Sequence, residues 1–523
     1  MKQFFAAVLC AVAQFLLTGS ASAQFNANFQ TVTISGVSSN WAGVADYIVG
    51  SNTFGDVLII ENGGVLSNFD AIIGDLSGAS NNTAIVTDPG SAWTNYQGLA
   101  VGSSGAGNNL VVSNGGAVLV SYPGAIALGY SVAGSSNNSV TVTGTGSVLS
   151  NNSDLYVGYR GKNNRMTISD GGVVRDSTGW VGTGVSSSSN NVVIVTDSGS
   201  VWSNGLMVHG DISTGNQMTI TNGGQVRCAN IIMGNAASSS NNVGTVTGAG
   251  SVWNIGPSSG LGSLEVGWGG RNNQLTIRDG AAVHATHGLI GESKSNVVTV
   301  TGTGAVWDSM GDLTVGRDGA TNTLAIGPGG SVVATNVYVS YLVNAAGNRI
   351  NIEGGSLMST NVTIGNPTAP NCAATGQITV DSGTLLVTNA AGNATLEVIS
   401  GTLTLNGGTT VVDRLVITNA CARFVHAGGT LIVGSYVFDQ TKFHSTAVTP
   451  SSNDVLLTWM MGPGATNALQ AAAGDPNGGF GTNGFTDIFV VTNNSAAGTV
   501  TNYVDVGAGT NKPARYYRVR LVP

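Results

Sequence analysis

Short segments in which apolar and polar residues alternate recur along most of the chain, as in MTIS (166–169), MTIT (218–221), LTIR (275–278) and VTVT (298–301). Strict alternation predicts β-strands with one face buried and the other in solvent. Gly-Gly, Asn-Gly and Ser-rich turns separate the segments, so each strand is too short to bury enough surface by itself. We therefore expect many short strands that gain a core only by stacking on one another.

The strands belong to an internal repeat. A Gly-containing turn recurs at positions 62–64, 114–116, 170–172, 222–224, 279–280 and 328–330, so the period is roughly 52 residues. A second motif keeps the same order and ends at Trp93 (GSAW), Leu149 (GSVL), Trp202 (GSVW), Trp253 (GSVW) and Trp307 (GAVW). A period of this length is typical of solenoids and propellers.

Each repeat divides into two similar halves. An apolar residue followed by Gly recurs mostly at half the interval of the repeat, as at Val101-Gly102, Leu128-Gly129 and Val157-Gly158. Asparagine pairs recur at a similar spacing, at 81–82, 108–109, 137–138, 163–164, 190–191, 241–242 and 272–273. The structural unit is therefore one coil of about 26 residues, half of the repeat.

These periods predict an all-β fold, a right-handed parallel β-helix (β-solenoid) with a small all-β C-terminal module. Asparagines that recur once per coil can stack in register, as side-chain ladders do in cross-β structures. A propeller with four strands in each repeat is the alternative. The aligned asparagine pairs at the half-period argue against it.

Five segments are expected along the chain. They are a signal peptide (1–23), an N-terminal cap (24–50), a solenoid of two-coil repeats (51–340), a continued solenoid with a shorter period (341–444) and the C-terminal module (445–523). The turn motifs continue after residue 340 but come closer together. From about residue 445 the composition changes, with an aromatic and basic strand at 515–520.

The N-terminus predicts export. Lys2 precedes an apolar run from Phe4 to Leu17, and the small residues 21–23 follow, so cleavage is expected after Ala23. A transmembrane anchor is the alternative, but the run is too short to cross a bilayer, and no later run of about 20 apolar residues exists. We expect a secreted or cell-surface protein without a membrane span after cleavage.

Composition limits the classes of partner that the protein is expected to bind. Only 8% of residues are charged and the formal net charge is −8, so the chain lacks the basic surface expected for nucleic acid. After cleavage three cysteines remain: Cys228, Cys372 and Cys421. Export permits a disulfide, for which Cys372 and Cys421 are the better pair because both lie downstream. The alternative is three buried thiols.

The repeat resembles a known class, the β-strand repeats associated with bacterial autotransporter passengers and PEP-CTERM (exosortase-sorted) surface proteins. The resemblance rests on MTITNGGQV (218–226), IMGN (232–235) and NNVGTVTGAGSVW (241–253), and it covers about residues 50 to 340. It implies a setting at the cell surface or in the extracellular matrix.

Candidate chemistry is sparse. Asp88 and Asp197 occupy a turn position that is Gly144, Gly248 or Gly302 in other repeats, which is what a turn tolerates and an active site does not. His284 and His287 are three positions apart and would point to opposite faces of one strand. We expect no catalytic residues, metal or cofactor.

Aromatic residues offer a binding site instead. Trp93, Trp202, Trp253 and Trp307 fall at the same place in their repeats, so they would line up along one edge, where exposed rings could stack on sugars. The alternative is that each Trp covers a corner of the core, with Leu149 in the equivalent place.

The sequence thus predicts an exported, non-catalytic structural or adhesive surface or matrix protein, whose partners are extracellular polysaccharide or other cell-surface components. Two alternatives remain open at this point: a polysaccharide-binding β-helix that uses the tryptophans, and a polysaccharide lyase or hydrolase.

Overall fold

A computed structural model gives the fold. It describes residues 25–41, 45–131, 134–256, 262–367, 372–417, 419, 421–438, 443–448, 453–461, 465–475, 479, 481, 484–494, 499–510 and 514–522. The predicted signal peptide and its cleavage site lie outside these residues. By internal contacts the chain forms two units: unit 1 is Met1–Leu264 with Trp268–Gln274, and unit 2 is Glu265–Gly267 with Leu275–Pro523.

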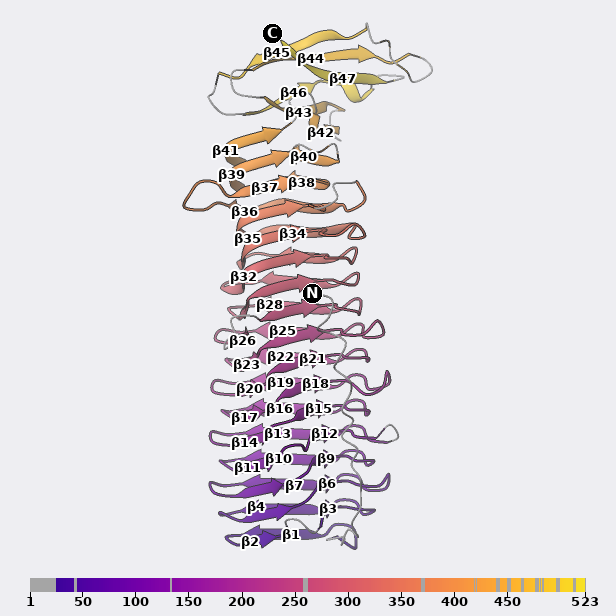
Figure 1. Ribbon diagram of the computed structural model, residues 1–523, viewed down its shortest axis with the longest axis vertical. Coiled ribbons are helices and arrows are strands. Elements are labelled where there is room, and N and C mark those ends of the chain that lie inside the picture. The colour runs from indigo at the N-terminus through magenta and orange to yellow at the C-terminus, as the bar shows by residue number, and fades with distance from the viewer. Residues whose placement is uncertain are drawn as a thin grey trace. The chain divides into compact units, whose positions relative to one another are not determined.

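Unit 1 is a parallel β-solenoid whose coils contribute one strand to each of three faces (Figure 1). Face A contains β1 (Thr31–Ser35), β4 (Val57–Glu61), β7 (Thr83–Thr87), β10 (Asn109–Ser113), β13 (Ser139–Thr143), β16 (Arg165–Ser169), β19 (Val192–Thr196), β22 (Gln217–Thr221) and β25 (Val243–Thr247).

Face B contains β2 (Ser38–Asn40), β5 (Val65–Asn68), β8 (Ala92–Asn95), β11 (Ala117–Val120), β14 (Val148–Asn151), β17 (Val173–Arg175), β20 (Val201–Ser203), β23 (Gln225–Cys228) and β26 (Val252–Ile255). Face C contains β3 (Tyr47–Val49), β6 (Ala71–Ile73), β9 (Leu99–Val101), β12 (Ile126–Leu128), β15 (Asp154–Val157), β18 (Thr178–Val181), β21 (Leu206–His209) and β24 (Asn230–Met233). Two strands, β27 (Ser263–Val266) and β28 (Gln274–Arg278), cross the unit boundary in sequence.

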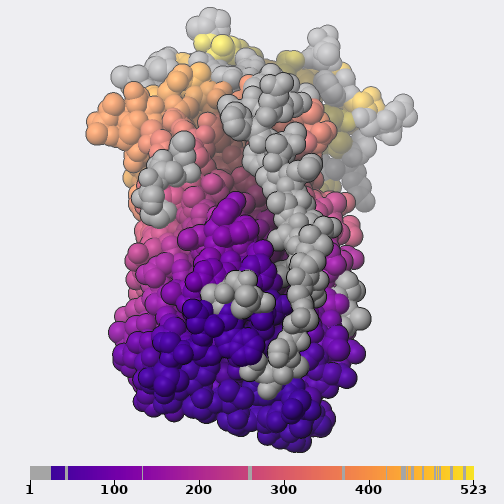
Figure 2. Space-filling model, turned by 60° about the horizontal axis from the view of Figure 1, so that its bottom comes forward, coloured from indigo at the N-terminus to yellow at the C-terminus, as the bar shows by residue number. Residues whose placement is uncertain are grey.

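The first coil already has all three strands. Residues 31–49 lie within the expected N-terminal cap, yet β1, β2 and β3 pair in parallel with β4, β5 and β6. Figure 2 shows this first coil in indigo at the near end of unit 1. The cap segment is therefore built as a coil of the solenoid.

The alternating sequence pattern becomes the core. In β13, Val140 and Val142 point inward with no exposed surface, and Met166 and Ile168 follow them in register on β16. Each coil thus places branched or unbranched aliphatic groups directly on those of the next, which excludes water from a continuous interior.

Unit 2 also contains parallel coils, and in several of them neighbouring strands have merged. Its strands are β29 (Ala282–Ala285), β30 (His287–Ile290), β31 (Val297–Thr301), β32 (Ala305–Val315), β33 (Thr323–Ile326), β34 (Gly330–Val339), β35 (Asn348–Ile364), β36 (Gly376–Val387), β37 (Thr395–Val398), β38 (Gly401–Leu405), β39 (Thr409–Ile417), β40 (Ala422–His426) and β41 (Thr430–Phe438). The merged strand β32 pairs with both β29 and β30, and in its pairing with β34 the register shifts between Ser309 and Asp312.

The coils of unit 2 shorten toward the C-terminus. Ile378 pairs with Leu403, 25 positions later, whereas Leu403 pairs with Phe424, only 21 positions later. The closer spacing of the turn motifs after residue 340 reflects this loss of loop residues.

Two antiparallel sheets follow the last coil. The first contains β42 (Phe443–Val448), β43 (Val455–Met461) and β46 (Thr499–Asp505), and the second contains β44 (Thr466–Ala473), β45 (Thr486–Thr492) and β47 (Arg515–Val522). A short 3₁₀ helix, Ala508–Thr510, precedes β47. Trp459, Leu457, Met461 and Leu469 belong to their buried core. The predicted fold, a β-solenoid with a small all-β C-terminal module, is confirmed.

An asparagine ladder ties the coils of unit 1 together at the turn that leads from face C to face A. Its members are Asn82, Asn108, Asn138, Asn164, Asn191, Asn216, Asn242 and Asn273, all without exposed surface. Each of the first seven donates from its backbone N–H and its Nδ2 to the Oδ1 of the next, as Asn138 does to Asn164 at 3.0 and 3.1 Å. The predicted stacking of asparagines in register is confirmed.

In all of the pairs except 108–109, the first asparagine forms the turn and the second joins the ladder. Asn137, the first of its pair, has a φ of 59°, a left-handed conformation that asparagine tolerates better than most residues. That turn directs the second, Asn138, into the ladder. Asn163, Asn190, Asn241 and Asn272 repeat the left-handed φ of 57 to 58°.

Among the residues that the structure describes, no helix has the length and apolar character needed to cross a bilayer.

Candidate ligand-binding surface

The four tryptophans predicted to bind sugar are core residues. Trp93, Trp202, Trp253 and Trp307 each have 0% exposed surface. A ring with no accessible face cannot stack on a sugar, so the structure corrects this prediction. In unit 1 the inward column on face B runs Leu66, Trp93, Val118, Leu149, Val174, Trp202, Val226 and Trp253. The alternative is therefore right, and Leu149 does occupy the equivalent place.

Two of these indoles also satisfy buried polar groups on the preceding coil. Trp93 donates its Nε1–H to Oδ1 of Asn68 at 2.6 Å, and Trp202 donates to Oδ2 of Asp176 at 2.5 Å. Burial raises the pKa of Asp176 well above its usual range, and the Trp202 hydrogen bond only partly opposes this. All four tryptophans thus provide core packing, and at Trp93 and Trp202 the motif also provides a buried hydrogen bond.

The predicted cysteine pair is joined. A disulfide links Cys372 and Cys421, whose Cα atoms lie 5.1 Å apart across 49 residues of sequence. Cys228 is a buried free thiol, and burial raises its pKa to about 12. The sequence left open a Cys372–Cys421 disulfide or three buried thiols. The structure contains the disulfide, and Cys228 is a buried thiol.

The histidines do not form a site. His284 lies on β29, its Nδ1 3.7 Å from Asp308 Oδ2, whereas His287 lies on the next strand, β30. His209 is fully buried, its Nε2 is 3.0 Å from the Asn216 carbonyl, and burial lowers its pKa to about 4. Within the described ranges no group of three or more His, Cys, Asp or Glu side chains could hold a metal ion.

A different set of aromatic rings reaches the surface of unit 1. Tyr156 on β15 and Trp180 on β18 are register partners on the outer side of face C, and their ring centroids are 6.2 Å apart at 25°. Tyr159 follows β15 in the turn, 4.8 Å from Tyr156, and stacks on Tyr130 of the preceding coil at 5.4 Å and 17°. All four side chains are half-buried. We call Tyr130, Tyr156, Tyr159 and Trp180 the aromatic row.

Basic side chains lie beside the aromatic row. The Arg160 guanidinium carbon is 5.1 Å from the centroid of Tyr159, a cation–π contact. Arg160 and Lys162 line a hollow of about 130 Å³ together with Gly161 and with Gly134, Ser135, Ser136 and Ser187 from the turns of the adjacent coils. Arg160 Nε is buried and makes no hydrogen bond with any described residue.

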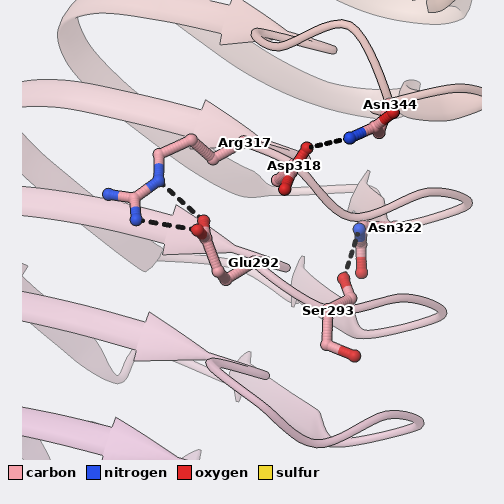
Figure 3. A network of polar contacts seen from close by, with 6 residues as sticks. All are labelled: Glu292, Ser293, Arg317, Asp318, Asn322 and Asn344. Carbon is pink, nitrogen blue, oxygen red and sulfur yellow. Dashed lines mark hydrogen bonds and ion pairs between the residues drawn. The ribbon is translucent and has the colours of Figure 1, made fainter.

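In unit 2 the positive charge of an arginine in the corresponding turn is neutralised by a carboxylate. There Arg317 donates its Nε–H to Oε2 of Glu292 at 2.6 Å and its Nη2–H to Oε1 at 2.8 Å, a bidentate pair that bridges two coils (Figure 3). The Glu292 hydrogen bond raises the pKa of Arg317 further. Asn344 donates to Asp318 at 3.0 Å beside it. Arg160, by contrast, forms no ion pair with a described residue.

Two buried carboxyl groups lie close together in the first coils of unit 1. Asp46 and Asp70 precede β3 and β6 and are each 8% exposed, and the Asp70 backbone N–H donates to Asp46 Oδ1 at 3.2 Å. Burial raises the pKa of Asp70 to about 7, with a further contribution from the Asp46 charge. Asp70 Oδ1 is buried and has no hydrogen-bond partner among the described residues. The raised pKa of Asp70 makes the stability of the folded state depend on pH.

Reasoning from the sequence missed the aromatic row and its cations, although a signal for them exists. Between positions 25 and 274 the only Lys and Arg side chains outside the stretch 160–175 are Arg227 and Arg271. That one stretch contains Arg160, Lys162, Arg165 and Arg175. Three of the four rings, Tyr156, Tyr159 and Trp180, lie immediately beside it in the sequence.

This arrangement has the chemistry of a binding surface. Partly exposed rings present apolar surface, and the Arg160 guanidinium, which forms no ion pair with a described residue, can donate to an anionic group in the small hydroxyl-lined hollow. Comparison of the sequence with protein-family models and with curated proteins finds no match.

Proposed function

We propose that this protein is an exported, non-catalytic structural or adhesive component of the cell surface or extracellular matrix. It belongs, in this proposal, with the β-strand repeats of autotransporter and PEP-CTERM-associated proteins that its motifs resemble. The observation that carries the proposal is the asparagine ladder, which joins successive coils of unit 1 through buried side chains. Such a stack presents a large lateral surface while leaving little interior space for a substrate.

Two further observations support an extracellular setting. The segment 1–23 has the order of a secretory signal peptide. The Cys372–Cys421 disulfide suits an oxidising compartment, because cytosolic thiols are kept reduced.

Cell fractionation tests the proposal. The full chain, produced in a Gram-negative host, is expected to lose segment 1–23 and to begin at Gln24, outside the cytoplasm. A variant with Leu16→Arg and Leu17→Arg, which interrupts the apolar run, is expected to stay inside with its N-terminus intact. Wild-type protein that remains cytoplasmic and uncleaved would overturn the proposal, as would release of new reducing ends from a polysaccharide by the purified chain.

A further inference from the structure

Arg160 is held in place by its neighbours but forms no ion pair with any residue that the structure describes. The half-buried guanidinium lies over Tyr159, which itself packs against two neighbouring rings of the aromatic row. The backbone of the turn is fixed as well, because the Arg160 N–H donates to the Gly129 carbonyl at 3.0 Å. A preorganised arginine gains more from a carboxylate than a mobile surface lysine does, since little side-chain entropy is left to lose.

The hollow beside Arg160 suits a small anionic group. Its volume of about 130 Å³ is too small for a whole sugar chain but accommodates a carboxylate and its immediate surroundings. Lys162 supplies a second positive charge, while the serine side chains and turn backbone around it supply neutral polar groups. The charge of the hollow is therefore positive in a chain whose formal net charge is −8.

We infer that the aromatic row, Arg160 and Lys162 together bind an acidic polysaccharide built from hexuronic acids. A hexuronate carries its carboxylate directly on the pyranose ring, so one sugar needs apolar surface and a cation side by side. The row offers both: Trp180 and Tyr156 lie within one coil of Arg160, which is 5.1 Å from the Tyr159 centroid. This inference rests on the proposed function, because it supplies the ligand class for an extracellular stack of coils.

Single-stranded nucleic acid also combines stacking with negative charge, but the rest of unit 1 disfavours it. A bound strand needs cations along its whole path. Outside the stretch 160–175, unit 1 has only Arg227 and Arg271 as basic residues between positions 25 and 274. Acidic residues outnumber basic ones over the same range.

The test is calorimetric titration of the signal-free full chain with short oligomers of galacturonic acid. We expect saturable binding that weakens with added salt. Arg160→Gln is expected to weaken it about tenfold or more, the usual consequence of losing a charge-assisted pair, and Arg160→Lys is expected to restore only part of it. Trp180→Ala is expected to weaken binding about threefold to tenfold through lost ring contact.

Matched controls separate binding from folding. Arg227→Gln removes an exposed arginine of face B, and Tyr96→Ala removes a tyrosine that is 48% exposed. Both should leave affinity unchanged, and every variant should unfold in a single transition above the temperature of the titration. Equal binding of neutral dextran, tighter binding of oligothymidylate, or the same affinity for wild type and Arg160→Gln would each overturn the inference. Correct export with no uronate binding would remove the inference while leaving the proposed function standing.

Discussion

Gly158 and Asn191 occupy two sides of one contact between successive coils of unit 1. A side chain at Gly158 would collide with the Asn191 amide, and Gly158 also has a φ of 78°. Gly102 meets Asn138 in the same way. The apolar-Gly pairs and the asparagine pairs that recur in the sequence are therefore complementary halves of one structural device.

The first prediction concerns this contact. Asn191→Ala should lower the free energy of unfolding by about 1–3 kcal/mol, because it leaves buried groups of Asn164 and Asn216 unpaired. Gly158→Ala should also destabilise, through both the collision and the left-handed φ. The double variant should lose less free energy of unfolding than the two single variants lose together. The reason is that Asn191→Ala empties the space that the methyl group added at position 158 would fill. Urea unfolding measures all three, and strictly additive values would contradict the proposed contact.

A second prediction concerns the tryptophans. Trp202→Ala should destabilise by about 3–5 kcal/mol, the usual cost of emptying a large core site. Trp202→Phe should retain part of the packing but leave the buried Asp176 carboxyl without its indole donor. The exposed control Tyr96→Ala should change stability by less than about 0.5 kcal/mol. A similar melting temperature for Trp202→Ala and Tyr96→Ala would show that Trp202 is not in the core.

The third prediction is a dependence on pH. The folded pKa of Asp70 is about 7, against an ordinary value of 3.8. Below the ordinary value both states hold the proton; between the two values only the folded state does. The contribution of Asp70 to the free energy of unfolding should therefore fall as pH rises from about 4 to about 7 and then level off, while the lowered pKa of His209 contributes in the opposite direction over the same range.

Asp70→Asn should flatten that profile, because the amide is neutral at every pH. Asp46→Asn should shift the fall to lower pH, because it removes the neighbouring charge that helps to raise the Asp70 pKa. Thermal unfolding followed across this pH range gives the profile. An unchanged slope in Asp70→Asn would contradict the assignment.

The fourth prediction concerns the disulfide. Replacing Cys372 and Cys421 by Ala should cost about 2–4 kcal/mol, since the bond closes a long loop in the unfolded chain. Reductant should lower the unfolding temperature of wild type but not of the double variant. Cys228→Ala should leave the response to reductant unchanged, because that thiol is buried and unbonded. Insensitivity of the wild type to reductant would count against the bond.

The coil, its period and its ladder could be predicted from the sequence because each depends on residues that recur. Asn138 and Gly102 are noticeable only because equivalent residues return one coil later. Stacking in register turns such a linear repeat into a contact, so periodicity alone was enough.

The tryptophans show where recurrence misleads. A residue that returns in every repeat is more often one that the core needs, and the apolar residue Leu149 in the same column already pointed that way. The alternation of side chains along the strand settles the matter: on β20, Trp202 is the inward residue between the two outward ones, Val201 and Ser203.

The aromatic row was missed for the opposite reason. Tyr156 and Tyr159 return at the same spacing at Tyr338 and Tyr341 and not once per coil, and the neighbours of Tyr156 and Trp180 in register on face C are Ala127 and Val208. Only the alignment of one coil on the next brings Tyr156 against Trp180, and the turn conformation brings Tyr130 against Tyr159. Because a comparison of repeats looks for residues that recur in every unit, it does not mark these rings as a site.

Distances between spin labels on face A of unit 1 test the central claim, that each coil lies directly on the one before. Thr33, Thr141 and Thr245 occupy a single register column in β1, β13 and β25. With Cys228 replaced by Ala and labels at Thr141 and Thr245, four coil steps predict a backbone separation of about 19 Å, and labels at Thr33 and Thr245 predict about 38 Å. Distances that grow in proportion to the number of coils would support the stacking. Equal distances for the two pairs, or broad distributions without a maximum, would contradict it.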